Sequence, residues 1–255
     1  MRKIAAIILA LVMVCGLTAC GKGDTQSAKS EPRDQSEMSS EENGTASFKY
    51  HQMLESDNSK YYYEANVVEE FVEDEVTEEG LKGEARDGKG NYVLLTGEEK
   101  LDIRDIETKN AFYSVYDSDK EYSRDENDAS DEGEEDTLKL IYAKSDQMEM
   151  DGKTYDYDEY QGKYEFEGYT EDEQVVVEDY VLIRRYVINE KGELHAIIEL
   201  QEKIGENGKK NTPIYRKTEK ITKFQEGQFP KNVFKIPKDY EETAAFPEEE
   251  ALLEE

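Results

Sequence analysis

The stretch "YYYEANVVEEFV", residues 61–72, decides the fold. Its side chains alternate between two faces with a period of two, which is typical of a β-strand with one buried and one solvated side. The predicted buried face holds Tyr61, Tyr63, Ala65, Val67 and Phe71, and the opposite face holds Glu64, Asn66 and Glu70. We therefore expect the folded part of the chain to begin on a strand that is rich in tyrosine.

Similar stretches recur along the chain, with turn signals between them. Strands are predicted at residues 90–97, 100–106, 111–117, 138–144, 153–161, 180–188, 193–200, 213–224 and 229–240. The turn signals lie at residues 87–88, 108–110, 117–119, 151–152, 189–192 and 206–208. This order predicts an antiparallel meander. A short helix is expected at residues 48–55, where Phe48, His51, Gln52 and Glu55 share a face.

The N-terminus has the features of an export signal. Arg2 and Lys3 precede an apolar run at residues 4–14, which is too short for a membrane span of about 20 residues. The sequence Leu17-Thr18-Ala19-Cys20 resembles the lipobox of bacterial lipoproteins. That resemblance implies cleavage before Cys20 and attachment of diacylglycerol to its sulfur. The alternative is a plain signal peptide that happens to contain a cysteine.

The domain boundaries follow from changes in composition. We expect a signal peptide at residues 1–19 and a lipidated Cys20 with a flexible tether at residues 20–47. An antiparallel β domain is predicted at residues 48–240, with an acidic loop at residues 124–136 and an acidic tail at residues 241–255. This organisation predicts a protein anchored by lipid at the outer face of the bacterial cytoplasmic membrane, with two acyl chains on one cysteine.

Charge and motifs exclude several classes of function. A net charge of −30 repels nucleic acid, so we expect no nucleic-acid partner. Cys15 and Cys20 are the two cysteines, and both are used or lost in processing. The acidic run at residues 125–136 lacks the spacing of a calcium loop, and His51 and His195 are far apart. No catalytic motif is present. The sequence therefore predicts no enzymatic activity, no cofactor and no metal site.

A resemblance to a known family rests on the sequence from the helical segment onwards. The Tyr-rich strand, "DGKTYDYDEYQ", the hairpin "YVINEKGELHAIIEL" and the ending "FPKNVFKIPKDY" together resemble the LolA/LppX family of bacterial lipoproteins and lipoprotein carriers. The resemblance covers roughly residues 48–240. It implies a mainly β fold, with a curved antiparallel sheet in the form of a half-barrel and a few short helices. It also implies a lipid or lipoprotein ligand in some members.

Apolar side chains of the predicted strands are candidates for a ligand cavity under such a sheet, because a single sheet must cover both of its faces. The candidates are Tyr61, Tyr63, Val67, Tyr92, Leu94, Ile103, Phe112, Tyr142, Ile183 and Ile198. Two hypotheses remain. In the first, the concave face binds a lipid or other hydrophobic molecule. In the second, the core is filled, and the protein is a structural, interaction or sensor protein of the cell envelope.

Basic residues gather near the C-terminal end of the predicted domain. Lys217, Lys220 and Lys223 fall in a segment where few acidic residues oppose them. They could form a basic patch that faces anionic headgroups or an acidic partner. Alternatively, they pair with acidic side chains on neighbouring strands.

Overall fold

The computed structural model describes residues 45–126, 138–169, 175–205 and 209–243. The predicted signal peptide, Cys20 and most of the tether lie outside the described residues, as do most of the acidic loop and of the acidic tail. The described residues belong to one compact unit. No helix among them is long and apolar enough to cross a membrane.

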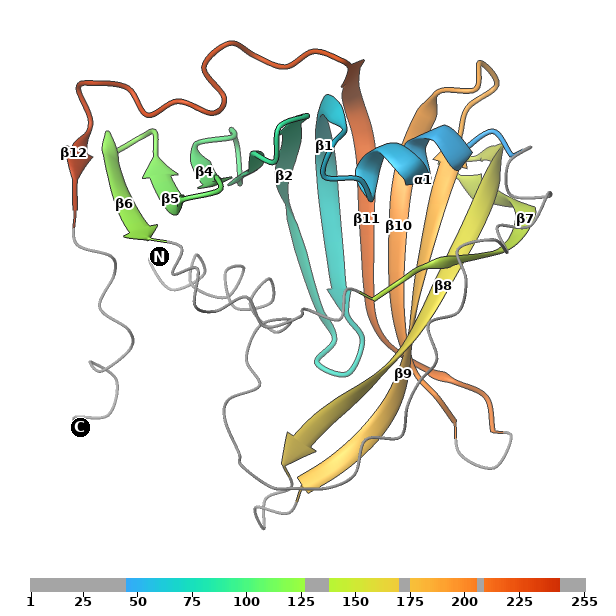
Figure 1. Ribbon diagram of the computed structural model, residues 1–255. Coiled ribbons are helices and arrows are strands. Elements are labelled where there is room, and N and C mark those ends of the chain that lie inside the picture. Colours follow the sequence, from blue (N-terminus) through green and yellow to red (C-terminus); the bar gives the residue numbers. More distant parts are fainter. Residues whose placement is uncertain (1–44, 127–137, 170–174, 206–208, 244–255) are drawn as a thin grey trace. The chain divides into compact units, whose positions relative to one another are not determined.

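One sheet of twelve strands makes up nearly all of this unit (Figure 1). Its strands are β1 (Lys60–Phe71), β2 (Val76–Asp87), β3 (Tyr92–Gly97), β4 (Ile103–Glu107), β5 (Ala111–Tyr116), β6 (Glu121–Glu126), β7 (Ile141–Met150), β8 (Lys153–Tyr169), β9 (Val175–Ile188), β10 (Leu194–Lys203), β11 (Thr212–Glu226) and β12 (Glu241–Glu242). The helix of the described residues is α1 (Phe48–Leu54). The predicted fold class, mainly β with an open, curved antiparallel sheet, is confirmed.

The sheet consists of two meanders that meet in its middle. The strand order is β12-β6-β5-β4-β3-β2-β1-β11-β10-β9-β8-β7, so β1 lies beside β11 although they are far apart in the sequence. All the pairs are antiparallel except the short parallel pair of β12 with β6. The sequence predicted one antiparallel meander, whereas the structure has two, joined by the pairing of β1 with β11.

Three strands are additions to the predicted set: β2, β6 and β12. Strand β2 has the sequence "VTEEGLKGEARD", in which charged residues take the positions where a half-buried strand usually carries apolar ones. Conversely, residues 229–240 were predicted as a strand but form turns and irregular backbone. Pro230 and Pro237 lack the N–H group that a strand ladder requires.

Helix α1 covers part of one face of the sheet, which we call the helix face and which carries Tyr61, Tyr63 and Val67 (Figure 1). Tyr50 is buried against this face, and Met53 and Leu54 pack beside it. The predicted helix exists, and His51 of its predicted face packs against the sheet together with Tyr50, Met53 and Leu54. The Ser47 hydroxyl, just before α1, donates to the Asp158 carboxylate at 2.5 Å, so the domain begins before residue 48.

Residues 227–240, which we call the strap, lie on the opposite face of the sheet, against strands β1 to β6. We call this face, along the whole sheet, the strap face. Val233 is buried there among Val93, Ile106 and Val115, and further apolar residues of the strap surround it. The strap, not a strand, therefore completes this half of the core.

Arg104 of β4 holds the strap in place. Its side chain is buried and binds the Asp117 carboxylate through two hydrogen bonds of 2.7 Å each. The remaining guanidinium nitrogen donates to three carbonyl oxygens of the strap, those of Asn232, Val233 and Lys235, at 3.2, 3.1 and 2.9 Å. A planar group with five donors suits this arrangement, which lysine cannot reproduce.

We expect Arg104→Ala to lower the free energy of unfolding by about 3 kcal/mol, because it leaves buried carbonyl groups and a carboxylate without their donor. Urea denaturation measures this loss, and limited proteolysis should show earlier cleavage within residues 227–240. Arg104→Lys should recover only part of the stability. Lys109→Ala, at an exposed cation of the β4–β5 turn, is the control and should be neutral. A neutral Arg104→Ala would contradict the role of Arg104.

Candidate functional site

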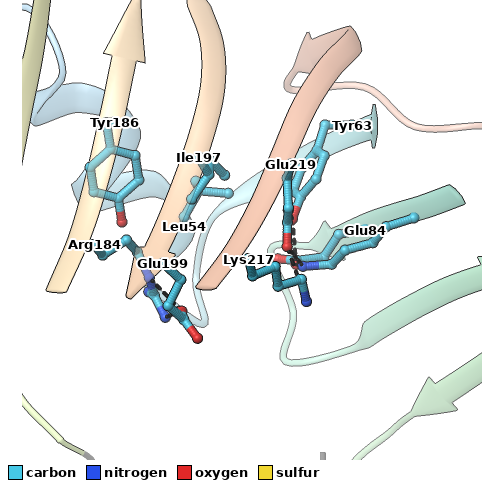
Figure 2. Close-up of a pocket in the computed structure, with 10 residues that line it drawn as sticks. Leu54, Tyr63, Glu84, Arg184, Tyr186, Ile197, Glu199, Lys217 and Glu219 are labelled. Carbon is cyan, nitrogen blue, oxygen red and sulfur yellow. Dashed lines mark hydrogen bonds and ion pairs between the residues drawn. The ribbon is translucent and has the colours of Figure 1, made fainter. Parts of the chain in front are cut away.

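A network of charged and phenolic side chains is buried on the helix face where the two meanders meet. We call Tyr63, Lys82, Glu84, Lys217 and Glu219 the buried ion network (Figure 2). They come from β1, β2 and β11, three strands that lie side by side in the sheet. Strand alternation places all five on the same face of the sheet, where Glu84 stands opposite Tyr63, Lys82 opposite Ala65, Glu219 opposite Val67 and Lys217 opposite Glu69.

Glu219 is the centre of the buried ion network. Its carboxylate receives the Lys82 ammonium at 2.8 Å, the Lys217 ammonium at 3.3 Å and the Tyr63 hydroxyl at 2.9 Å. Burial by itself would raise the pKa of Glu219, but Lys82 and Lys217 outweigh this effect and lower that pKa to about 2. The carboxylate is therefore ionised at neutral pH although it is buried.

Glu84 completes the network on the side of β2. It pairs with Lys82 at 3.1 Å and accepts hydrogen bonds from the hydroxyls of Tyr61 and Tyr63, the latter at 2.8 Å. Burial opposes ionisation of Glu84, but Lys82 and the two hydroxyls together lower its pKa. For Lys82, burial favours the neutral amine, yet the two carboxylates hold its pKa well above the usual value.

A second ionic group lies beside this network, on β9, β10 and α1. Arg184 binds the Glu199 carboxylate at 2.9 Å and also pairs with Glu55, which follows α1. The Tyr186 hydroxyl donates to Glu55 at 3.3 Å. These contacts fasten the C-terminal end of α1 to the sheet, as Ser47 fastens its N-terminal end.

The pocket between these groups is small, with a volume of about 120 Å³. Its lining residues are Leu54, Tyr63, Lys82, Glu84, Arg184, Tyr186, Ile197, Glu199, Lys217 and Glu219 (Figure 2). Pockets for small organic ligands usually measure roughly 300–1,000 Å³ and have mostly apolar walls. Every charged residue of the lining already has an oppositely charged partner. This part of the helix face is therefore a filled, polar core.

His51 of α1 belongs to the same core. Its ring stacks on Tyr160 with 3.8 Å between the ring centroids, and its Nδ1 lies 3.4 Å from the Tyr186 hydroxyl. Burial lowers the pKa of His51 to about 4, against the opposing effect of Glu55 and with a further contribution from Arg184. The imidazole is thus neutral at physiological pH and acts as an aromatic packing group.

A hollow of about 340 Å³ lies between the β3–β4 loop and strands β1, β2 and β11. Its lining residues are Glu64, Ala65, Asn66, Leu81, Lys82, Lys100, Leu101 and Thr222. Most of these are polar or charged, and Glu64 is already paired with Lys223 at 2.8 Å. The hollow therefore has mixed walls, with apolar surface from Ala65, Leu81 and Leu101 beside the polar groups.

The helix face of strands β3 to β5 is different. We call Tyr92, Leu94, Ile103, Phe112 and Tyr116 the open patch. All five side chains are half-buried, and they belong to none of the three apolar clusters of the described residues. The opposite side of the same strands is fully covered by the strap.

Strands β3 to β5 show this contrast in their burial patterns. Val93, Ile106 and Val115 on the strap face are at most 1% exposed. Leu94 and Ile103, which point to the helix face of the same strands, remain half-buried. An apolar sheet face that keeps this exposure is a place where a ligand or partner can bury area.

The structure brings together some of the predicted cavity residues and separates others. Tyr61, Tyr63, Val67, Tyr92, Leu94, Ile103, Phe112 and Tyr142 lie on the helix face. Tyr61 and Tyr63 are fully buried in the core and are engaged with Glu84, so they do not line an open cavity. Ile183 and Ile198 lie on the strap face, and Ile198 packs there with Val187 and Ala196.

Each lysine of the predicted basic patch has an acidic partner. Lys217 pairs with Glu69 and Glu219, both at 3.3 Å. Lys220 pairs with Asp151 at 2.9 Å, and Lys223 pairs with Glu64 at 2.8 Å. Lys217 lies on the helix face and the other two lie on the strap face. This arrangement favours cross-strand pairing over a single basic surface.

The remaining predicted features concern the histidines and metals. His195 is half-buried, and its ring stacks on Tyr155 at 4.3 Å, with its pKa lowered by burial. The His195 ring is therefore partly enclosed by Tyr155. Within the described residues, no group of three or more His, Cys, Asp or Glu side chains is arranged to hold a metal ion.

Sequence reasoning did not find the buried ion network, because Lys82 and Glu84 lie in β2, which was not predicted as a strand. The signal that could have found it is that Glu78, Lys82, Glu84 and Arg86 are all even-numbered residues of "VTEEGLKGEARD" (76–87), so their side chains share one face of the strand. Because β2 lies next to β1, this charged face of β2 stands beside the odd-numbered residues of the Tyr-rich strand β1.

Comparison with known proteins adds little beyond the fold. No family model and no curated protein matches the chain. One similar solved structure is an uncharacterized conserved protein from Thermus thermophilus, with 10% identity, coverage of 79% of this chain and 100% of that chain, and a TM-score of 0.41. Another is a LolA superfamily protein from Nitrosomonas europaea, with 8% identity, coverage of 72% and 96%, and a TM-score of 0.31. At these values neither structure carries an argument about function.

We expect Glu219 to make the stability of the protein depend on pH. Its pKa is lower in the folded state than the ordinary value of 4.5, so its contribution is complete above pH 4.5 and is lost as the pH falls towards 2. The expected loss is on the order of 3 kcal/mol, at about 1.4 kcal/mol for each unit of the shift. Urea denaturation between pH 7 and pH 2 measures it.

The matched variants for this test are Glu219→Gln and Glu226→Gln. Glu219→Gln should be less stable at pH 7, because Lys82 loses a buried partner, and should lose less stability in acid. Glu226→Gln, at an exposed position of the same strand, should follow the wild-type curve. If Glu219→Gln and Glu226→Gln gave the same curve, the assigned role of Glu219 would be wrong.

Proposed function

We propose that this chain is a non-enzymatic binding protein that takes a lipid or other hydrophobic ligand on the open patch. In this proposal it is exported and anchored through lipidated Cys20 at the outer face of the bacterial cytoplasmic membrane. In this proposal the tether predicted at residues 20–47 links Cys20 to the domain, and Ser47 at its end is bound to Asp158.

One observation carries the ligand proposal. Leu94, Ile103 and Phe112 are half-buried on a sheet face where they join no apolar cluster of the described residues. The same strands are fully buried on the strap face, so this part of the sheet is covered on one side and open on the other. A ligand with an apolar body would complete the second side, since buried apolar area contributes about 25 cal/mol per Å².

The second candidate is an interaction protein with a filled core and no small ligand. The observation that favours it is the buried ion network, which fills the helix face beneath α1 and leaves a pocket of only about 120 Å³. In that case the open patch would bind the surface of another protein. Native mass spectrometry of the chain, purified gently from a membrane-containing lysate, distinguishes the two. Extra mass that disappears on delipidation supports the first candidate, and a bare mass supports the second.

The anchor has its own test. We expect Cys20→Ala to move the protein from the detergent phase to the aqueous phase of a Triton X-114 partition, because no lipid can then be attached. Cys15→Ala, which changes a cysteine within the predicted signal, should leave the protein in the detergent phase. If the Cys20→Ala protein stayed membrane-bound, the lipid anchor would be excluded.

The ligand site is tested with a neutral apolar probe, N-phenyl-1-naphthylamine, whose fluorescence rises in apolar surroundings. We expect Ile103→Asn to weaken its binding at least tenfold, because the substitution places a polar group in the open patch. Ile141→Asn is the matched control, since Ile141 is 64% exposed on β7, away from the open patch. Equal binding to both variants and to the wild type would contradict the open patch as the site.

A further inference from the structure

Asp105 lies in the middle of the open patch. In the register of the sheet it stands directly opposite Leu94 of β3 on one side and Ser114 of β5 on the other. Ile103 is two residues before it on the same face of β4. Directly opposite residues on neighbouring strands have Cβ atoms about 4.5–5.5 Å apart, and diagonal neighbours remain within reach of aromatic rings. The apolar side chains of the open patch therefore surround one carboxyl group.

This carboxyl group has few partners. The Ser114 hydroxyl donates to it at 2.8 Å, and within the described residues it forms no ion pair. An ionised carboxylate has about four sites that accept hydrogen bonds, so most of its capacity is unused. Burial raises the pKa of Asp105, and the hydrogen bond from Ser114 only partly offsets this effect.

Three other carboxylates on the helix face have cations, and Asp158, which has none, accepts three hydrogen bonds, from the Ser47 backbone N–H and hydroxyl and from the Ser145 hydroxyl. Glu84 and Glu219 share Lys82, and Glu199 binds Arg184. Each of these buried or half-buried acids has a cation from a neighbouring strand, whereas Asp105 has a serine. Desolvating an acid without supplying a cation is costly, and the cost is removed when a ligand brings the positive charge.

We propose that Asp105 accepts the positively charged head of the ligand of the open patch, so that the ligand is an amphiphile with a protonated amine and an apolar body. This inference rests on the proposed function and names the ligand class for the same site. The aromatic ring of Tyr116 adds a favourable surface for an ammonium group, whereas the Tyr92 ring already carries the guanidinium of Arg86. Burial, with a further contribution from the Asp105 carboxylate, raises the pKa of Tyr116.

An anionic head group fits this site poorly. Asp105 and Glu107, two residues further along β4 on the same face, would both repel a phosphate or a fatty-acid carboxylate. Lys82 pairs with Glu84. Arg86 pairs with Asp57 at 2.5 Å and lies over the Tyr92 ring, 4.9 Å from its centroid, at the edge of the open patch. The carboxylates of Asp105 and Glu107 therefore favour a cationic head group over an anionic one beside β4.

The experiment compares three probes with the same ten-carbon chain: decylammonium, decanol and decanoate. Each is titrated into the full chain by calorimetry below its micelle concentration, at about 0.15 M salt, where charges further than roughly 8 Å apart are screened. We expect decylammonium to bind at least tenfold more tightly than decanoate. Asp105→Asn should reduce this preference to less than threefold while decanol binding is unchanged.

The matched control is Asp119→Asn, which removes the same charge from an exposed position of the β5–β6 turn. It should keep the full preference for decylammonium, because a general attraction to this acidic protein is the same in both variants. Thermal unfolding of Asp105→Asn checks that it folds, and the amide oxygen introduced by this substitution can still accept the Ser114 hydrogen bond.

The outcomes separate this inference from the proposed function. If decanol binds but the two charged probes bind equally well, or if Asp105→Asn keeps the preference, the role of Asp105 is overturned and the hydrophobic site stands. If none of the three probes binds, the proposed function itself fails.

Discussion

The contact between Glu219 and Lys82 is the interaction on which the rest of the structure depends. Glu219 comes from β11 and Lys82 from β2, and strand β1, whose Tyr63 donates to Glu219, lies between these two strands. A shift of one residue in any of these strands would send one partner to the opposite face and leave a buried charge alone. The network therefore fixes the register where the two meanders meet, at a pairing that no short turn enforces.

The two faces of the sheet are covered by different means, and this difference creates the candidate site. Helix α1 covers the helix face over the second meander and β1, and the strap covers the strap face over the first meander. The helix face of β3 to β5 is left with apolar side chains that remain half-buried. A small helix and a short strap can cover only part of a twelve-stranded sheet, so the remaining area is available for binding.

The positions of the basic side chains determine which carboxylates of this acidic protein are paired. The chain has 62 acidic and 32 basic residues, so many carboxylates cannot have a partner. The buried ones on the helix face beneath α1 receive Lys82, Lys217 and Arg184, and Arg104 holds the strap. Asp105 is half-buried without a cation and accepts one hydrogen bond, from Ser114, whereas Asp158, which also lacks a cation, accepts three. In a protein of this charge, an exposed acid needs no explanation, but a partly desolvated one among apolar side chains does.

The sequence by itself determined the strands with clear alternation, the turns between them and the mainly β fold, because a period of two and turn chemistry are local properties. It also predicted the N-terminal signal and the lipobox, which concern residues outside the described part of the chain. It missed β2, whose charged face becomes a core face only beside Tyr61 and Tyr63. It grouped Ile183 and Ile198 with Leu94, although Ile183 and Ile198 lie on the strap face and Leu94 lies on the helix face. Alternation defines two faces within each strand, but only register, bulges such as the one between Leu194 and Ala196, and the long-range pairing of β1 with β11 decide which face meets which. The tertiary structure therefore decided where the buried charges lie and which apolar face stays open.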